Sequence, residues 1–218
     1  MPAKIVISCP VIRALSLIFK PTATWDRILQ RRPGITYLLL RCLFPMMFIA
    51  AGAEGFGMVK WGKPQTVIHR FQKFGVDETL LYEGARLLMM LLIAISSAVL
   101  IKIFAETFGK RHPFRQTMTL VVYALSPLFL LRLLDMTPGL SPWVTWGIGI
   151  VLCTEVLYQG VPRILEPDPP NAFGLYFMSS LVLVATTGLE RFITAWYLQG
   201  NMRPIQDIVS DILGRLHG

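Results

Sequence analysis

The chain has 218 residues, of which 54% are hydrophobic and only 16% are charged. Soluble domains carry about 25% charged residues, and so apolar a chain lacks the polar side chains that would cover a soluble surface. The formal net charge of +8 agrees with the excess of lysine and arginine that membrane proteins carry in their cytoplasmic loops. No basic stripe with interleaved aromatic residues occurs, so we expect no nucleic-acid partner.

Residues 1–34 predict a cytoplasmic or interfacial segment. Its first part is apolar with spaced cations, and from Pro10 onward the spacing favours a short helix lying in the membrane interface. Thr24 is the expected N-cap of a second short helix, Trp25–Arg31. Trp25 itself is well placed to anchor this segment at the interface between lipid and water.

Five apolar stretches follow, and each is long enough to cross a bilayer. A helix needs about 20 mostly apolar residues for this crossing. The sequence therefore predicts an all-α, polytopic membrane helix bundle with five transmembrane helices, which forms one membrane domain over residues 35–198. The five stretches are 35–58, 84–106, 117–135, 142–160 and 172–198.

Proline and glycine mark special points within two of the stretches. Pro45 predicts a kink in the first stretch and Pro127 a break in the third, both of which membrane helices tolerate. The first stretch also contains Gly52, Gly55 and Gly57 among alanines, and small residues at such spacing allow a neighbouring helix to approach closely.

Two segments outside the stretches have helical spacing. Within the polar connection of residues 59–80, the sequence VIHRFQKF predicts a surface helix. In the tail, residues 199–218, apolar side chains recur at helical intervals, which predicts an amphipathic helix. This tail is too short and too charged to span, so the chain is expected to carry interfacial segments at both ends.

The positions of loop cations predict the orientation of the chain. Residues 1–34 hold six cations, the second loop three and the fourth loop one, whereas the first loop holds four, the third none and the tail two. Cytoplasmic loops carry the excess of cations. We therefore expect the N-terminus in the cytoplasm and the C-terminus on the exported side.

Charged residues inside the stretches form the candidate polar cluster. Charges at membrane depth are costly and face the bundle interior or water. Two interpretations are open: the side chains reach the headgroups and pair among themselves, or they line a polar groove that opens outward. Arg132 and Asp135 can meet on one helix face, and Glu155 is the most isolated acid. The candidates are Glu54, Arg86, Arg132, Asp135, Glu155, Glu190 and Arg191.

No motif for catalysis, cofactor binding or metal binding occurs. The three histidines are far apart, and none has a second histidine or cysteine at ligand spacing. Ser96, Ser97 and Ser126 lie in apolar surroundings without a base in sequence reach, so they are interpreted as helix-packing hydroxyls. We expect no catalytic residue, no cofactor and no metal.

The third and fourth stretches carry a family resemblance. Tyr123-Ala124 is followed by Pro127, then by Pro138, and Gly160 closes the fourth stretch after Leu157-Tyr158. In this order the pattern resembles the Yip (Ypt/Rab-interacting) family of membrane proteins, its bacterial branch in particular. The resemblance implies five membrane helices with a cytosolic N-terminus. The long cytosolic region of the eukaryotic members is missing, so no Rab GTPase partner is expected.

These observations predict an integral inner-membrane protein of the Yip-like type. The expected role is that of a non-enzymatic scaffold or membrane-organising protein, whose partners are the lipid bilayer and other membrane proteins or a second copy of the chain. The alternative is a small-solute or lipid transporter, or a lipid-binding protein, that uses the polar cluster on the outward side.

Overall fold

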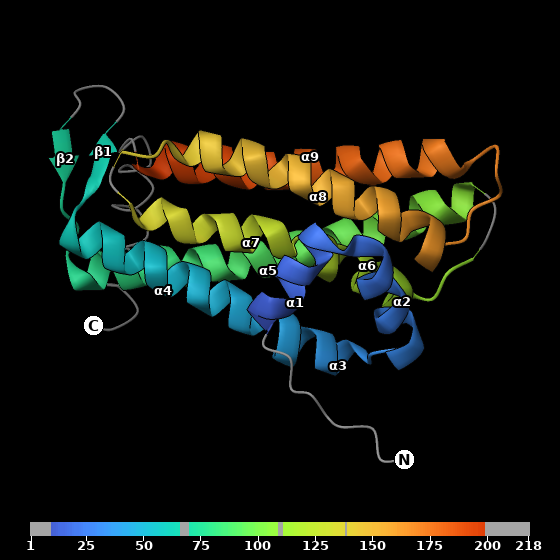
Figure 1. The fold of residues 1–218 in the computed structure, drawn as a ribbon. Coiled ribbons are helices and arrows are strands. Elements are labelled where there is room, and N and C mark those ends of the chain that lie inside the picture. Colours follow the sequence, from blue (N-terminus) through green and yellow to red (C-terminus); the bar gives the residue numbers. More distant parts are fainter. Residues whose placement is uncertain (1–9, 66–69, 109–110, 138, 199–218) are drawn as a thin grey trace, which may run out of the picture.

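Five long helices run side by side in the computed structural model, and two short helices cover one end of this bundle (Figure 1). The structure describes residues 10–65, 70–108, 111–137 and 139–198. All five long helices have the length and apolar character needed to cross a membrane, which confirms the predicted fold class. We call them the five crossings. The first consists of α3 (Ile35–Leu38), the π-helical turn η1 (Leu39–Leu43) and α4 (Phe44–Lys60), and the second is α5 (Val76–Thr107). The third consists of α6 (Phe114–Ala124), α7 (Ser126–Arg132) and the 3-10 turn η2 (Leu133–Met136), the fourth is α8 (Pro142–Ile164) and the fifth is α9 (Ala172–Leu198).

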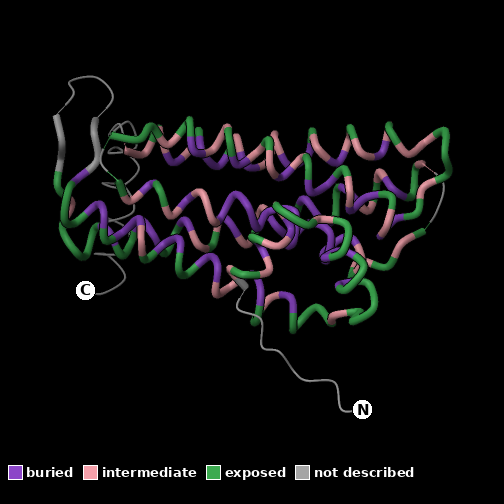
Figure 2. The backbone as a smooth tube through the Cα atoms, viewed as in Figure 1, coloured by how far each residue is buried: buried purple, intermediate pink, exposed green. Residues whose placement is uncertain are grey.

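The third of these helices, α6 to η2, lies at the centre of the bundle. Most of its residues are buried, whereas the outer helices keep one exposed side (Figure 2). It packs against α5 and α8, and α9 closes the bundle against both of these. The exposed sides carry large apolar residues such as Leu92, Val151 and Leu181. In a bilayer these side chains contact lipid tails, so their exposure carries no hydrophobic penalty.

Both expected proline distortions are confirmed. The π-helical turn Leu39–Leu43 ends two residues before Pro45, and one residue, Leu125, separates α6 from α7, with Pro127 in the first turn of α7. A proline lacks the N–H that would continue the helical ladder, and its ring clashes with the carbonyl four residues earlier. The wider turn and the break remove this clash without ending the crossing.

The small residues of α4 differ in what they contact. A Cβ atom on Gly57 would lie 2.7 Å from the carbonyl oxygen of Met136 and 2.9 Å from its Cα, so only glycine fits against η2. Gly55 faces Thr79, whereas Gly52 faces open space. The predicted close approach of a neighbouring element therefore holds for the C-terminal part of this seam only.

We expect Gly57→Ala to destabilise the protein by about 1–3 kcal/mol, because the new methyl group would push the backbone of η2 away. Gly52→Ala is the matched control, and it should be neutral or stabilise by up to about 1 kcal/mol, since alanine is the better helix former. Thermal unfolding of the two variants in the same detergent measures the difference. Equal midpoints would show that the approach of α4 to η2 is not tight.

The connection between the first two crossings differs from the prediction. The expected surface helix VIHRFQKF is wrong, since its residues Arg70–Gln72 form strand β2, which pairs antiparallel with β1 (Lys63–Gln65). So short a helix would leave most of its backbone groups unpaired, whereas the hairpin pairs them.

The second crossing also begins earlier than residue 84, at Val76. Its first turn is held by the carboxylate of Glu78, which accepts a hydrogen bond from the Gly75 N–H at 3.2 Å. A helix of 32 residues is about 48 Å long, and the hydrocarbon core is about 30 Å thick. We therefore expect its first turns, with Asp77 and Glu78, to project beyond the hydrocarbon.

Helices α1 (Pro10–Phe19) and α2 (Pro21–Arg31) form the N-terminal layer, which packs on α7 and α8. The short helix expected from Pro10 is confirmed. The expected N-cap at Thr24 is wrong, because α2 begins at Pro21, whose fixed φ suits the first helical position. The Thr24 hydroxyl instead donates to the carbonyls of Ser16 and Lys20 at 3.2 Å and 2.8 Å. This joins the two helices at their sharp turn.

The expected role of Trp25 as an anchor exposed at the interface of lipid and water is also wrong, because its side chain is fully buried within the protein. The indole N–H donates to the carbonyl oxygen of Val156 at 3.2 Å, and the ring meets Tyr123 edge to face. Gly160 on α8 leaves the space for this ring, since a Cβ there would lie 2.6 Å from it. Trp25 therefore fastens the N-terminal layer to the bundle.

Candidate functional site

Charged side chains from four of the five crossings meet inside the bundle, at the end where α4 and α9 finish. We call these six residues the ion-pair network. Each comes from an apolar helix that supplies one or two charges at the same depth. The network consists of Glu54 on α4, Arg86 on α5, Arg132 on α7, Asp135 on η2, and Glu190 and Arg191 on α9.

Glu190 is the centre of the first part of the network. Its Oε1 atom accepts a hydrogen bond from the Nε of Arg86 at 3.1 Å and a second one from the Nη2 of Arg132. Arg86 also pairs through Nη1 with the carboxylate of Glu54. One carboxylate of α9 therefore holds α5 and α7, and Arg86 extends the chain of contacts to α4.

Asp135 organises the second part of the network. One of its oxygens pairs with the Nη2 of Arg191 at 2.7 Å, and the other accepts a hydrogen bond from the hydroxyl of Thr145 at 2.5 Å. Thr145 lies in the first turns of α8, so this part adds the fourth crossing. All five crossings are thus connected at this end of the bundle.

The expected contact between Arg132 and Asp135 is not formed among the described residues. Arg132 pairs with Glu190 and Asp135 with Arg191, so both residues pair with α9 instead of with each other. The reason is tertiary: α9 presents an opposite charge to each of them, Glu190 to Arg132 and Arg191 to Asp135, and these contacts form instead.

Burial determines what the network can do. All six side chains are buried, and Arg86 and Glu54 are only 1% exposed. A buried charge without a partner costs several kcal/mol, and a paired one with its hydrogen bonds in place costs far less. Three arginines face three carboxylates, so the network compensates its own charge and joins the helices.

The candidate cluster predicted from the sequence contains all six of these residues but leaves out three neighbours. Glu83 and Tyr82 are buried beside the network, and the guanidinium of Arg86 lies 5.6 Å from the centre of the Tyr82 ring. Thr145 is the third. The spacing of Glu83 and Arg86, three residues apart on one helix, is a signal that could have included Glu83. Thr145 carries no such signal.

Glu155 stands apart from the other candidates. Its side chain is exposed on α8, and it takes part in none of the ion pairs of the network. The structure therefore separates it from the group in which the sequence placed it. This position makes Glu155 a useful reference residue, since Glu155 is an acid on a membrane helix outside the network.

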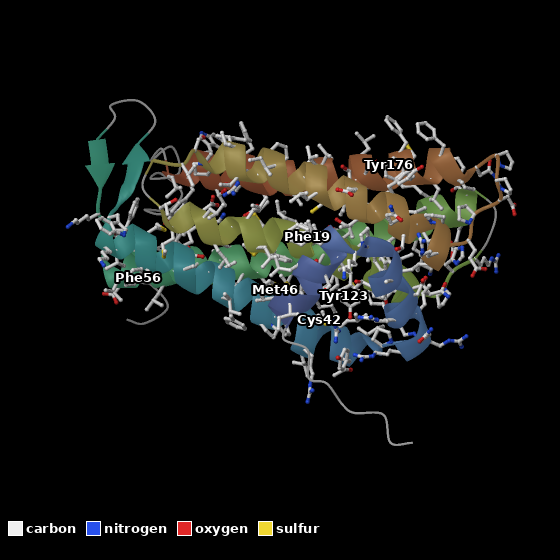
Figure 3. The ribbon with its side chains drawn as sticks, in the orientation of Figure 1. Phe19, Cys42, Met46, Phe56, Tyr123 and Tyr176 are labelled. Atoms are coloured by element: carbon white, nitrogen blue, oxygen red, sulfur yellow. The ribbon has the colours of Figure 1, made fainter. Side chains whose placement is uncertain are left out.

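Three of the four residues of the family pattern have structural roles in the described part of the chain. The Tyr123 hydroxyl accepts a hydrogen bond from Arg13, and its oxygen lies 3.6 Å from the Sγ atom of Cys42. Tyr123 and Cys42 are labelled in Figure 3. Gly160 accommodates Trp25, and Pro127 separates α6 from α7. Pro138 lies outside the described residues.

Within the described part of the chain, no group of three or more histidine, cysteine, aspartate or glutamate side chains is arranged to hold a metal ion. The carboxylates of Asp135 and Glu190 accept their hydrogen bonds from arginines and a threonine of the chain itself. The arrangement is suited to joining helices within the membrane.

The family model of the Yip1 domain matches residues 15–189. This range contains the first four crossings, most of the fifth, and all residues of the network except Glu190 and Arg191. No curated protein and no solved structure matches the chain.

Proposed function

Because this chain belongs to the Yip1 domain family, we propose that it is a non-enzymatic protein of the bacterial inner membrane that organises the bilayer or holds membrane partners together. The pattern from Tyr123 to Gly160 supports the bacterial branch. The loop cations support a cytoplasmic N-terminus, which places the N-terminal layer in the cytoplasmic leaflet and the network towards the exported side.

The outward face of α1 is the observation that carries this proposal. Ala14 and Leu17 are buried against the bundle, whereas Ile12, Leu15 and Phe19 are 58%, 42% and 78% exposed. These three form an apolar ridge along one side of a helix that lies outside the crossings. Such a ridge is covered when the helix inserts between headgroups and acyl chains.

Insertion of α1 would increase the area of one leaflet only. A helix wedged into one leaflet bends the bilayer towards the opposite one, and its affinity depends on curvature. The bundle holds α1 at a constant depth through Ala14, Leu17 and the neighbouring Trp25. This gives the protein a physical means of shaping or selecting curved membrane.

We expect the triple variant Ile12→Ser, Leu15→Ser, Phe19→Ser to lose this effect. Vesicles reconstituted with the natural protein should be tubular or smaller than protein-free vesicles. In those molecules whose α1 lies in the outer leaflet, this helix expands that leaflet and bends the membrane. Vesicles with the variant should keep the diameter of protein-free vesicles. Cryo-electron microscopy of vesicles at one protein-to-lipid ratio measures the diameters.

The matched control replaces three apolar residues that face lipid within the crossings: Leu92→Ala, Val99→Ala and Leu181→Ala. These side chains are exposed as well, but they lie at membrane depth and do not wedge between headgroups. The control should behave like the natural protein. If the triple serine variant and the natural protein give the same diameters, α1 does not organise the bilayer in this way.

Transport through the polar cluster is the weaker alternative. A solute or proton path needs charged groups that are open to water, whereas six of the seven candidates are buried and pair with one another.

The division into a segment of residues 1–34, a membrane domain of residues 35–198 and a tail of residues 199–218 is also part of our proposal. The tail lies outside the described residues.

A further inference from the structure

A cavity of about 650 Å³ lies at the opposite half of the bundle from the network, between the N-terminal layer and the beginning of the first crossing. Its lining comes from α1, from α2, from the connection that follows α2, and from Tyr37 and Tyr123 on the crossings. A volume of this size is within the range of small-molecule sites.

The lining of this cavity is strongly cationic. Arg13, Arg27, Arg31 and Arg32 contribute to it, and its described lining residues include no aspartate or glutamate. Asp26, the acid of α2, is turned to Arg163 on α8 at 3.5 Å. Cations four residues apart on a helix, such as Arg27 and Arg31, repel each other. An anion in the cavity would remove this repulsion.

Arg13 is held in place at the inner part of the cavity. Its Nη1 donates to the Tyr123 hydroxyl at 2.8 Å and its Nη2 to the Tyr37 hydroxyl at 3.5 Å. Burial lowers the pKa of Arg13, but Tyr123, Tyr37 and Cys42 raise it by more, so the guanidinium stays charged. Two tyrosine hydroxyls thus fix the guanidinium of Arg13 at the lining of the cavity.

Arg32 reaches the cavity from an unusual backbone conformation. Its φ of 41° and ψ of 61° lie in the left-handed region, where a side chain is strained and glycine or asparagine is preferred after a helix. Strain of this kind is found at ligand sites. Arg32 lines the same cavity as the three other arginines.

We propose that this cavity binds the phosphate of an anionic phospholipid headgroup from the leaflet that contains the N-terminal layer. Guanidinium groups match phosphate oxygens in pairs, which makes arginine clusters suited to phosphate. A cavity this large accommodates a phosphoglycerol headgroup as well as the phosphate itself. Tyr37 belongs both to the cavity and to the first turn of the first crossing, so the cavity lies at headgroup depth.

The neighbouring surface also favours a lipid over a soluble phosphate. Ile12 lines the cavity and is exposed, and Ile35, Tyr37 and Leu40 are exposed where the first crossing begins. They provide an apolar path for acyl chains that leads away from the arginines. A free phosphate ion would use the arginines alone.

The test compares the full chain with the double variant Arg27→Gln, Arg31→Gln, in nanodiscs of phosphatidylcholine with and without phosphatidylglycerol. Native mass spectrometry measures the phosphatidylglycerol that stays bound. We expect about 10-fold weaker retention in the variant, since each arginine near the surface contributes to anionic lipid binding. The matched control, Arg111→Gln, Arg115→Gln, removes two exposed cations outside the cavity and should retain the lipid.

Two outcomes would overturn the proposal. Equal losses in both double variants would show general attraction to a cationic surface and overturn a specific site. Thermal stabilisation of the natural chain by inorganic phosphate, without stabilisation by phosphatidylglycerol, would overturn the lipid as the source. Should the glutamine variant unfold more easily in phosphatidylcholine alone, Arg27→Lys, Arg31→Lys replaces it, and weaker binding is again expected because lysine lacks the two-pronged geometry of arginine.

The cavity and the wedge proposed for α1 share Ile12, but their tests change different residues. Lipid retention reports on the arginines, whereas vesicle diameter reports on the apolar ridge of Ile12, Leu15 and Phe19. Either result can fail while the other stands.

Discussion

Replacing Glu190 by leucine is expected to lower the free energy of unfolding by about 3–5 kcal/mol, which is the cost of leaving buried charges without their partner. The Oε1 atom of Glu190 pairs with both Arg86 and Arg132. Its loss would remove the carboxylate that pairs with Arg132 and one of the two carboxylates that pair with Arg86 among the described ion pairs. Unfolding by sodium dodecyl sulfate in mixed micelles, followed by circular dichroism, measures the change.

Glu155→Leu is the control for this prediction. It removes the same charge from another membrane helix, but Glu155 is exposed and lies outside the network. We expect a change below about 1 kcal/mol, as for most substitutions away from buried charges. Equal losses for Glu190→Leu and Glu155→Leu would contradict a stabilising role of the network.

The same variants separate the structural interpretation from transport. If the network only stabilises the fold, the folded Glu190→Leu protein should not differ from the natural protein in solute uptake or in lipid binding. If Glu190→Leu leaves the unfolding transition unchanged and removes a measurable uptake of solute or protons into vesicles, the network belongs to a transport path, and the scaffold proposal is wrong.

Trp25→Ala is expected to have the second large effect, a loss of about 3–5 kcal/mol, because truncation of a fully buried aromatic ring leaves a cavity. The ring fills the space beside Gly160 and donates a hydrogen bond to Val156. The change should also free the N-terminal layer from α8. Thermal unfolding measures the stability, and protease cleavage within residues 1–34 measures the release of the layer.

Trp61→Ala is the corresponding control. Trp61 is 48% exposed at the far end of α4, so its truncation should cost less than about 1 kcal/mol. Faster cleavage of Trp25→Ala at unchanged stability would mean that the layer is held mainly by Trp25. If stability and cleavage both stay unchanged, the layer is attached through other contacts.

Local sequence features were sufficient for the crossings and their breaks. Pro45 and Pro127 distort their helices because a proline lacks an N–H and its ring clashes with the preceding turn, and both effects need no distant partner. The hairpin at Arg70–Gln72 was missed for the opposite reason, since its partner strand Lys63–Gln65 decides between strand and helix.

Trp25 shows the same limit for side chains. In sequence, a tryptophan that precedes a membrane span has the position of an interfacial anchor. Its burial depends on Gly160, which lies on another helix and leaves room for the ring. The cationic cavity was missed for a similar reason, because Arg13 joins Arg27, Arg31 and Arg32 only when α1 folds back onto α2 and the first crossing.

The sequence by itself determined that the chain is a five-helix membrane protein, because the length and apolar character of a crossing are properties of one continuous segment. It also predicted that the six charges of the network lie within the crossings. Only the tertiary structure decided how they pair. Arg86 and Glu190 are 104 residues apart, and Arg132 and Asp135 pair with Glu190 and Arg191, which lie 58 and 56 residues further along the chain.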